Sequence, residues 1–348
     1  MVSHRRTSQH AQTTLAGVTV VSAALATAAA ALSAPPAAAD PAGRPSTDRA
    51  AATARVDSLY VQAERATEKY NAAQARTKEL RHEVAALQDR TARAQERVNR
   101  MRGHLGALAA AQYRSGGIDP TVRLMLSERP DTFLEKASAL DRLGHRQADE
   151  LHGLRTAQRR LEQQRAETVR KLTELEAGRK AVARHKKDVQ RKLATARRLL
   201  NALPKRDRAA YERASRSDGH REATPDLGGA VPSSGRAAAA VAAVRAAVGS
   251  PYAWGSSGPT SFDCSGLTQW AYGRAGVSLP RTSQAQRGAG RQVPLSQARP
   301  GDLVIYRSDA SHVGMYVGNG QVVHAPYPGA RVRYDPVGMM PISSVTRP

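Results

Sequence analysis

The sequence predicts a multidomain protein in which a long α-helical antiparallel coiled-coil hairpin precedes a compact α+β domain. Two observations carry this prediction. An apolar heptad pattern runs through residues 46–204 in two arms of about 70 residues each, and the composition changes sharply at Arg236. After Arg236 the chain has no Lys and no Glu, glycine becomes frequent, and short apolar strands replace the long helical periodicity.

In the first arm, small and apolar residues recur in alternating steps of three and four. The series runs Val56, Leu59, Ala63, Ala66, Tyr70, Ala73, Thr77, Leu80, Val84, Leu87, Thr91, Ala94, Val98, Met101, Leu105 and Leu108. This is the a/d seam of a coiled coil, and its period of about 3.5 residues predicts a left-handed supercoil. Glycines at 116 and 117 and a proline at 120 are expected to end the helix.

The second arm repeats the apolar pattern every seven residues, from Leu154 to Leu203, just before Pro204. Because the two arms are nearly equal and a compact tip joins them, we expect an antiparallel hairpin roughly 100 Å long. A parallel dimer, in which each helix pairs with a second protomer, is the alternative. Residues 205–235 are rich in Arg, Ser, Asp, Gly and Pro without periodicity, so they are predicted to be a flexible linker.

Residues 1–39 have the features of a secretory signal peptide. Arg5 and Arg6 give a basic start, residues 13–32 are mostly small and apolar, and Ala37-Ala38-Ala39 offers a cleavage site. We therefore expect a secreted, cell-wall-associated protein, with a membrane anchor as the alternative. In that compartment the formal charge of +23 favours anionic wall polymers as partners and not nucleic acid.

Cys264 is the only cysteine of the chain, so it cannot form an internal disulfide. A free thiol outside the cell is an oxidation liability, and composition alone leaves an inert buried thiol and a nucleophile equally open. Asp263 and Ser261 are N-cap candidates that would place Cys264 in the first turn of a helix. There the free amides and the helix dipole stabilise a thiolate, which indicates a nucleophile.

His312 and His324 are the candidate proton carriers, on two strands that a tight turn joins. A two-residue turn at Asn319-Gly320 would put the histidines on opposite faces of the sheet. A three-residue loop with Gly320 left-handed would pair His324 with Gly314 and put both histidines on one face. We predict this odd-length loop, because it also gathers the apolar residues on the other face. Those residues are Val313, Met315, Val317 and Val323.

Six short motifs follow one another through residues 236–348. They are Pro251-Tyr252-Ala253-Trp254-Gly255, Asp263-Cys264-Ser265-Gly266-Leu267, Leu279-Pro280-Arg281, Pro300-Gly301-Asp302-Leu303, His312-Val313-Gly314 and His324-Ala325. Together they resemble the motifs of the NlpC/p60 family of cell-wall cysteine peptidases. The resemblance implies a papain-like fold over residues 236–348 and a peptidoglycan endopeptidase that needs no cofactor. Its expected substrates are peptidoglycan stem peptides, usually cut between D-γ-glutamate and a diamino acid.

The resemblance also implies a role for each matching residue. Cys264 is the expected nucleophile, His312 the general base, and His324 the polar residue that orients His312. The expected substrate-binding residues are Tyr252, Asp263, Ser265 and Arg281. In this thiol mechanism a thioester acyl-enzyme forms and water then hydrolyses it. No metal site is expected, because the domain has one Cys, no Glu and neither an H-E-x-x-H nor a C-x-x-C motif.

Other functions stay open at this point. A wall amidase or acyltransferase could use the same Cys–His site, and a structural protein could use the coiled coil as its working part with the domain as an anchor. For the hairpin we expect regulation or recruitment: it could cover the cleft, or receive a signal from a membrane complex at division sites. A passive spacer is the alternative.

Overall fold

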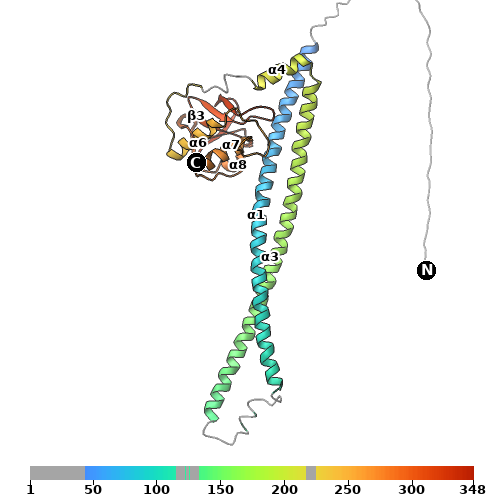
Figure 1. Cartoon of the computed structure of the whole chain (residues 1–348), viewed down its shortest axis with the longest axis vertical. Helices are drawn as coiled ribbons and strands as arrows, with labels where there is room; N and C mark the ends of the chain where they lie inside the picture. The colour runs from blue at the N-terminus through green and yellow to red at the C-terminus, as the bar shows by residue number, and fades with distance from the viewer. Residues whose placement is uncertain (1–43, 115–121, 123–124, 126–132, 217–224) are drawn as a thin grey trace, which may run out of the picture. The chain divides into compact units, whose positions relative to one another are not determined.

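The computed structural model describes residues 44–114, 122, 125, 133–216 and 225–348 (Figure 1). The predicted signal peptide over residues 1–39 and most of the hairpin tip lie outside these ranges. Residues 45–348 group as one compact unit, and every contact described below lies within it. Among the described helices, none combines the length and the apolar character that a membrane span requires.

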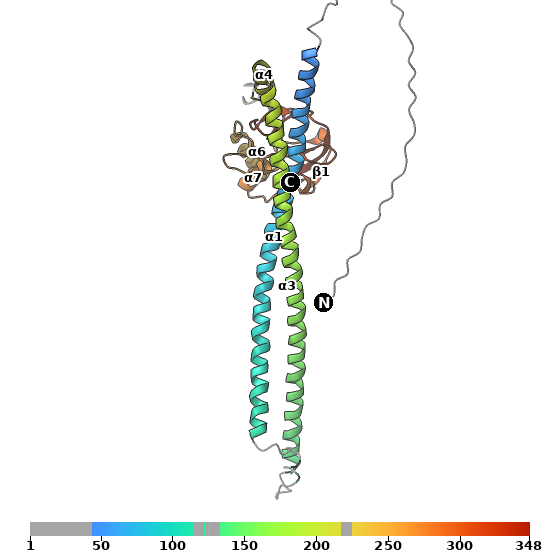
Figure 2. The same cartoon turned by 90° about the vertical axis from the view of Figure 1, so that its right-hand side faces the viewer.

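Helices α1 (Arg44–Arg114) and α3 (Phe133–Ala202) run side by side as the two arms of the hairpin (Figures 1 and 2). Their buried contacts follow the heptad seam. Val56, Ala63 and Ala66 pack with Val189, Leu193 and Ala196, and further along Leu80 and Val84 pack with Leu175. Residue numbers fall along α3 as they rise along α1, so the arms are antiparallel. The predicted hairpin within one chain is confirmed.

Helix α4 (Lys205–Arg216) occupies the first part of the segment predicted to be a flexible linker, residues 205–235. The Pro204 carbonyl begins the helix by accepting hydrogen bonds from the amides of Asp207 and Arg208. The Tyr211 hydroxyl donates to Asp57 of α1 at 2.7 Å and so fixes the helix to the hairpin. The prediction missed α4 because its 12 residues are mostly charged and present no apolar repeat.

The catalytic domain predicted over residues 236–348 consists of three α-helices and a six-stranded sheet. The helices are α6 (Gly235–Ala246), α7 (Cys264–Arg274) and the short α8 (Ser283–Gln286), with a 3-10 turn η2 (Leu295–Gln297). The strands are β1 (Arg291–Val293), β2 (Leu303–Tyr306), β3 (His312–Gly318), β4 (Gln321–His324), β5 (Arg333–Pro336) and β6 (Ile342–Arg347). Their order is β1-β6-β2-β3-β4-β5, and every neighbouring pair is antiparallel.

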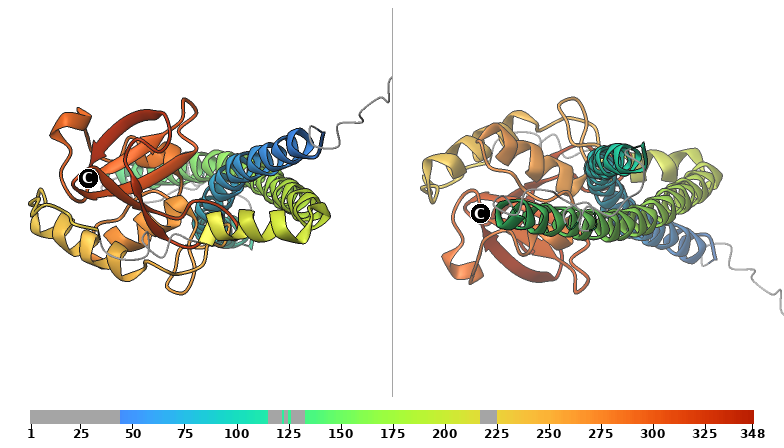
Figure 3. Two further views of the ribbon diagram at one scale, coloured as in Figure 1. Left: turned by 90° about the horizontal axis from the view of Figure 1, so that it is seen from above. Right: turned by 90° about the horizontal axis from the view of Figure 1, so that it is seen from below.

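Helices α6 and α7 cover one face of this sheet (Figure 3). Between the helices and the sheet lies the main core, to which α7 contributes Leu267 and Tyr272. The strands contribute the apolar residues that the alternation of the sequence predicts. Val313, Met315, Val317 and Val323 all belong to this core. The prediction of a shared apolar face is therefore confirmed.

The connection between β3 and β4 gives the predicted strand pairing, but with a different turn from the one predicted. Met315 pairs with Val323, a register that brings His324 opposite Gly314, so the two histidines share a face as predicted. The predicted three-residue loop is wrong, because Asn319 and Gly320 form a two-residue turn with φ of 46° and 67°. A bulge between residues 316 and 318 supplies the extra residue that changes the parity of β3.

Candidate active site

Cys264 is the first residue of α7, as the sequence predicts. Asp263 is the N-cap, and its Oδ1 accepts a hydrogen bond from the Gly266 amide at 2.7 Å. A side chain at position 266 would place its Cβ 2.1 Å from the Ser256 carbonyl oxygen, so only glycine fits this close approach. The thiol thus lies at the positive end of a short helix that is tightly packed against its neighbouring loop.

His312 is the first residue of β3 and begins a row of hydrogen bonds. Its Nε2 lies 2.7 Å from Nδ1 of His324, and Nε2 of His324 lies 2.7 Å from Oδ2 of Asp335 on β5. Burial raises the pKa of Asp335, but the hydrogen bond from His324 and the nearby positive charges lower it to about 2. Burial lowers the pKa of His324 to about 4, although the bond to Asp335 opposes this shift.

These bonds determine which nitrogens carry hydrogen. The Asp335 carboxylate can only accept, so Nε2 of neutral His324 donates to it and Nδ1 of His324 is an acceptor. His312 must then donate from Nε2. In neutral His312 this leaves Nδ1 with a lone pair, on the side of the ring that faces Cys264. A nitrogen in that state can accept the proton of the thiol.

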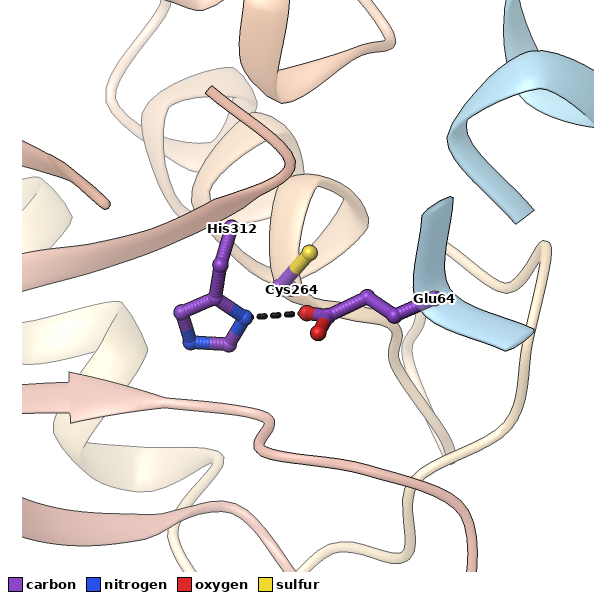
Figure 4. Close-up of side chains that lie close together, drawn as sticks. All are labelled: Glu64, Cys264 and His312. Carbon is purple, nitrogen blue, oxygen red and sulfur yellow. Dashed lines mark hydrogen bonds and ion pairs between the residues drawn. The ribbon is translucent and has the colours of Figure 1, made fainter. Parts of the chain in front are cut away.

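A third side chain, Glu64 of α1, meets this pair (Figure 4). A carboxylate oxygen of Glu64, the sulfur of Cys264 and a ring nitrogen of His312 lie within 4.8 Å of one another, and all three residues are buried. Oε1 of Glu64 contacts Nδ1 of His312, and Oε2 accepts from Nη1 of Arg307 at 2.6 Å. Burial raises the pKa of Glu64, but the charges and hydrogen bonds of His312 and Arg307 outweigh burial and lower it.

Glu68, one turn further along α1, also contacts the thiol and the residues next to it. Its carboxyl accepts from the Ser265 hydroxyl and from the Ser283 amide, each at 2.8 Å. The Cys264 sulfur donates to Oε1 of Glu68 over 3.9 Å. Burial and the negative charge of Asp263 raise the pKa of Glu68 to about 7.

Further residues of α1 complete the contact. Asn71 donates to Asp263 at 3.1 Å, but its own buried oxygen has no hydrogen-bond partner among the described residues. Tyr70, which the heptad pattern assigns to the seam, instead meets the Trp254 ring edge-on at 5.2 Å between centroids. A second tyrosine of α1, Tyr60, stacks on Tyr327 at 5.4 Å between centroids. One face of α1 therefore covers the site.

This cover changes the thiol. Burial, followed by the negative charges of Glu68, Glu64 and Asp263, raises the pKa of Cys264 well above its ordinary value. A hydrogen bond from the backbone of Val313 acts in the opposite direction and is outweighed. The sequence predicts a thiol whose pKa the helix start lowers. With α1 in place, the thiol is protonated instead.

The four predicted substrate-binding residues lie around Cys264. Arg281 forms a two-pronged ion pair with Asp263, at 2.6 and 3.0 Å, and also donates to Ser265 at 3.0 Å. Tyr252 is buried, and burial together with the charges of Asp263 and Cys264 raises the pKa of its phenol. Asp263 therefore caps the helix and holds Arg281 at the same time.

Sequence reasoning missed four residues of this site. Glu64, Glu68 and Asn71 are spaced i, i+4 and i+7, so one face of a mostly basic helix carries acidic and amide groups off the seam. That spacing is a signal that could have found them. Asp335 offers no such signal, because its role depends on the pairing of β4 with β5.

Comparisons with known proteins agree with the predicted resemblance of the C-terminal domain. Residues 249–345 match the family model described as the NlpC/P60 family. Over 118 residues the chain is 46% identical to a probable endopeptidase of Corynebacterium glutamicum. This match covers 34% of this chain and 56% of that protein. Over 90 residues it is 53% identical to the probable endopeptidase p60 of Listeria monocytogenes. This match covers 25% of this chain and 18% of that protein. The chain therefore spans little more than half of the first relative.

Two solved structures are each similar to about a third of the chain. The peptidoglycan hydrolase RipB of Mycobacterium tuberculosis is 35% identical, with 32% of this chain and 64% of that chain covered and a TM-score of 0.30. The P60 domain of an antigen of M. avium subspecies paratuberculosis is 36% identical, with 32% and 93% covered and a TM-score of 0.30.

Proposed function

From the NlpC/P60 domain that residues 249–345 form, we propose that this chain is a secreted cysteine peptidase that hydrolyses peptidoglycan stem peptides. The observation that carries the proposal is the row Cys264, His312, His324 and Asp335, in which each group orients the next toward the thiol. The names of the curated relatives, probable endopeptidases, support the same reaction.

The proposed reaction uses this row in order, once α1 has left the site. Nδ1 of His312 takes the thiol proton, and Sγ of Cys264 attacks the peptide carbonyl carbon. Free amides in the first turn of α7 stabilise the oxyanion. His312 then passes the proton to the leaving amine, a thioester remains, and His312 activates the water that hydrolyses it. His324 and Asp335 hold His312 in the required tautomer throughout.

The groups that hold Glu68 support the choice of bond. A D-γ-glutamyl linkage leaves the α-carboxylate of the glutamate free. The Ser265 hydroxyl and the Ser283 amide, which bind the Glu68 carboxyl at 2.8 Å, are suited to bind such a carboxylate after Glu68 leaves. We therefore propose cleavage between D-γ-glutamate and the diamino acid.

The second part of the proposal is that the hairpin regulates the peptidase by covering its site. Glu64 contacts the nitrogen of His312 that must take the proton, and Glu68 fills the position proposed for the substrate carboxylate. Both glutamates also raise the pKa of the thiol. A signal from a membrane complex at division sites would act by moving α1 off the domain.

Digestion of purified muropeptides tests the reaction. The double variant Glu64→Ala/Glu68→Ala, which removes both carboxyls from the site, is expected to release fragments that end at γ-glutamate, as product masses will report. Adding Cys264→Ala to that variant should abolish release. Cleavage at the lactyl amide would identify an amidase instead. Wall lysis that survives Cys264→Ala would favour the structural role of the coiled coil.

Activity on purified wall tests the regulation. We expect the Glu64→Ala/Glu68→Ala chain to hydrolyse wall at least about tenfold faster than the unaltered chain. Glu96→Ala is the matched control, because Glu96 lies on the same helix, is exposed and pairs with exposed Arg100 at 2.6 Å. Equal rates for all three chains would refute cover by α1.

Anionic wall polymers are the second proposed ligand class. A cavity of about 1070 Å³ lies where the hairpin meets the domain, and the cations Lys78, Arg81, Arg179 and Lys186 contribute to its lining. Such a cluster favours phosphate or carboxylate groups. Retention on purified teichoic acid should therefore fall with added salt and in a Lys78→Ala/Arg179→Ala chain. Unchanged retention would contradict this assignment.

A further inference from the structure

The geometry points to a metal site that exists only while α1 covers the domain, in which Glu64, Cys264 and His312 together hold a zinc ion (Figure 4). The inference rests on the proposed function in one respect, because it takes the covered site as the resting state of the peptidase. It adds a ligand of stated chemistry, a divalent metal ion, to that state. The sequence predicts no metal site within the domain; here the third donor comes from outside it.

The three donors are close enough for one ion. They come from α1, α7 and β3, and their ligand atoms lie within 4.8 Å of one another. Zinc binds sulfur, imidazole nitrogen and carboxylate oxygen over about 2.0–2.3 Å, which sets tetrahedral donors about 3.3–3.6 Å apart. Adjustments of about 1 Å at side-chain ends would therefore bring the donors into range. Their relative exposures are 2%, 1% and 0% for Glu64, Cys264 and His312, so water competes little for the ion.

Neighbouring groups already orient two of these donors. Arg307 binds Oε2 of Glu64 at 2.6 Å and leaves Oε1 directed at the histidine. His324 accepts from Nε2 of His312 at 2.7 Å, which leaves the Nδ1 lone pair on the same side as the thiol. Partners of this kind fix the ring orientation and the tautomer of histidines that bind metals.

The contact between Glu64 and His312 also calls for a cation. The hydrogen-bond row leaves a lone pair on Nδ1, and Oε1 of Glu64 is an acceptor, so two acceptors face each other. A proton satisfies these two atoms. A divalent ion satisfies the same two and the Cys264 sulfur as well, since the thiol releases its proton to solvent on binding. The charges of thiolate, carboxylate and ion then sum to zero within a buried site.

The donor set selects the metal. One thiolate, one imidazole and one carboxylate suit zinc better than the oxygen-binding ions magnesium and calcium. Because Glu64 leaves the set when α1 moves, the complete site belongs to the covered state alone. By linkage, zinc favours that state, holds the nucleophile as a ligand and joins α1 to the catalytic pair.

Cobalt(II) titration of the full, metal-free chain tests the site without any substrate. With a water molecule as the fourth ligand, the unaltered chain is expected to give a sulfur-to-cobalt charge-transfer absorption and the intense visible bands of four-coordinate cobalt, and Cys264→Ala should lose the charge-transfer band. In Glu64→Gln the Kd for zinc, measured by competition with cobalt, should rise about tenfold or more. Glu96→Gln is the control on the same helix, because Glu96 is exposed and pairs with Arg100, and it should keep the spectrum and stay within about threefold in Kd.

A second substitution at position 64 distinguishes loss of a zinc ligand from loss of the contact between α1 and the domain. Glu64→His supplies another zinc donor at the same position and should recover the four-coordinate cobalt spectrum that Glu64→Gln loses. No charge-transfer band in the unaltered chain, or equal zinc affinity for the unaltered and Glu64→Gln chains, would overturn the inference. The proposed peptidase stands or falls separately, on product masses from metal-free chains.

Discussion

At the scale of single residues, the orientation of His312 depends on a carboxylate two hydrogen bonds away. Asp335 accepts from His324, and His324 accepts from His312. Only this order of donors leaves Nδ1 of His312 without a hydrogen, so that it can take the thiol proton. Arg333 also donates to Asp335, at 2.8 Å, which keeps the carboxylate charged and in place. Asp335 is thus a positioning residue that acts through His324.

Asp335→Asn is expected to reverse this row. An amide nitrogen can donate to Nε2 of His324, which would make His324 donate to His312 and put the hydrogen of His312 on Nδ1. We expect kcat of the uncovered Glu64→Ala/Glu68→Ala chain to fall by about 100-fold or more while KM stays within about threefold. Steady-state kinetics on muropeptides measures this split. A rise in KM alone would contradict the positioning role.

Whether a site residue could be predicted depends on whether a local sequence pattern or a long-range strand pairing places it. Cys264, its N-cap Asp263 and the facing His312 and His324 were predictable, because short local patterns specify helix starts and strand faces. Asp335 was not, because the pairing of His324 with Arg333 brings it near, and no local pattern sets that register.

At the scale of elements, the apolar alternation of β3 and β4 predicts which residues share a face, but it does not predict the type of turn that joins the two strands. Apolar alternation required the two histidines to share a face, and the sheet obeys. The sequence did not reveal that a bulge would supply the extra residue. A three-residue loop and a two-residue turn with a bulge satisfy the same apolar alternation, so the pattern cannot distinguish them.

The start of α7 depends on one glycine. At Gly266 an added Cβ would lie 2.1 Å from a backbone oxygen of residue 256, so Gly266→Ala should destabilise the fold by about 3 kcal/mol or more. Gly273→Ala is the matched control on the same helix, where no other described atom outside its own helical turns lies within 4 Å of an added Cβ, and it should stabilise by roughly 0.5–1 kcal/mol. Denaturant unfolding of both variants checks the contrast. Equal effects would mean that the close approach is absent.

The contact of α1 with the domain should weaken as pH rises. The pKa of Glu68 is about 7 in the covered site and near its ordinary value of 4.5 in water. A raised pKa stabilises the covered state fully below pH 4.5, and this contribution is lost as pH rises through 7. The lowered pKa of Glu64 acts in the opposite sense, but its contribution is lost only as pH falls below 4.5, so it stays constant above that pH.

We therefore expect the uncovered fraction of the metal-free chain to rise by well over an order of magnitude, about 70-fold, between pH 5 and pH 8. Trp254 fluorescence reports the change, because the Tyr70 ring leaves its edge when α1 moves. In Glu68→Gln the dependence should flatten. A dependence that persists unchanged in Glu68→Gln would assign it to another group.

At the scale of the whole molecule, α1 serves two partners with different faces. Its apolar seam packs on α3, while Glu64, Glu68 and Asn71 meet the catalytic domain. The seam was predictable from its period. The second face was not assigned from the sequence, because polar residues on a charged helix ordinarily face water, and only the three-dimensional partner distinguishes the two cases.

The contact of α1 with the domain also contains unfavourable groups. The contact with the domain is stabilised by ion pairs and aromatic rings, yet it buries a carboxyl beside Asp263 and leaves the oxygen of Asn71 without a partner among the described residues. Such unfavourable groups cost free energy in the covered state. In the proposed regulation, they would keep the contact weak enough for a modest signal to reverse it.

The reactivity of Cys264 should report this reversal directly, since it is the only cysteine. With α1 in place, burial and the two glutamates keep the thiol protonated, so alkylation by iodoacetamide should be slow at pH 7. In Glu64→Ala/Glu68→Ala we expect alkylation at least about tenfold faster, with a midpoint at lower pH, because the start of α7 and His312 then act on the thiol unopposed. Glu96→Ala should match the unaltered chain. Faster alkylation with an unchanged midpoint would mean that α1 only blocks access, whereas a lowered midpoint means that it also controls the charge of the nucleophile.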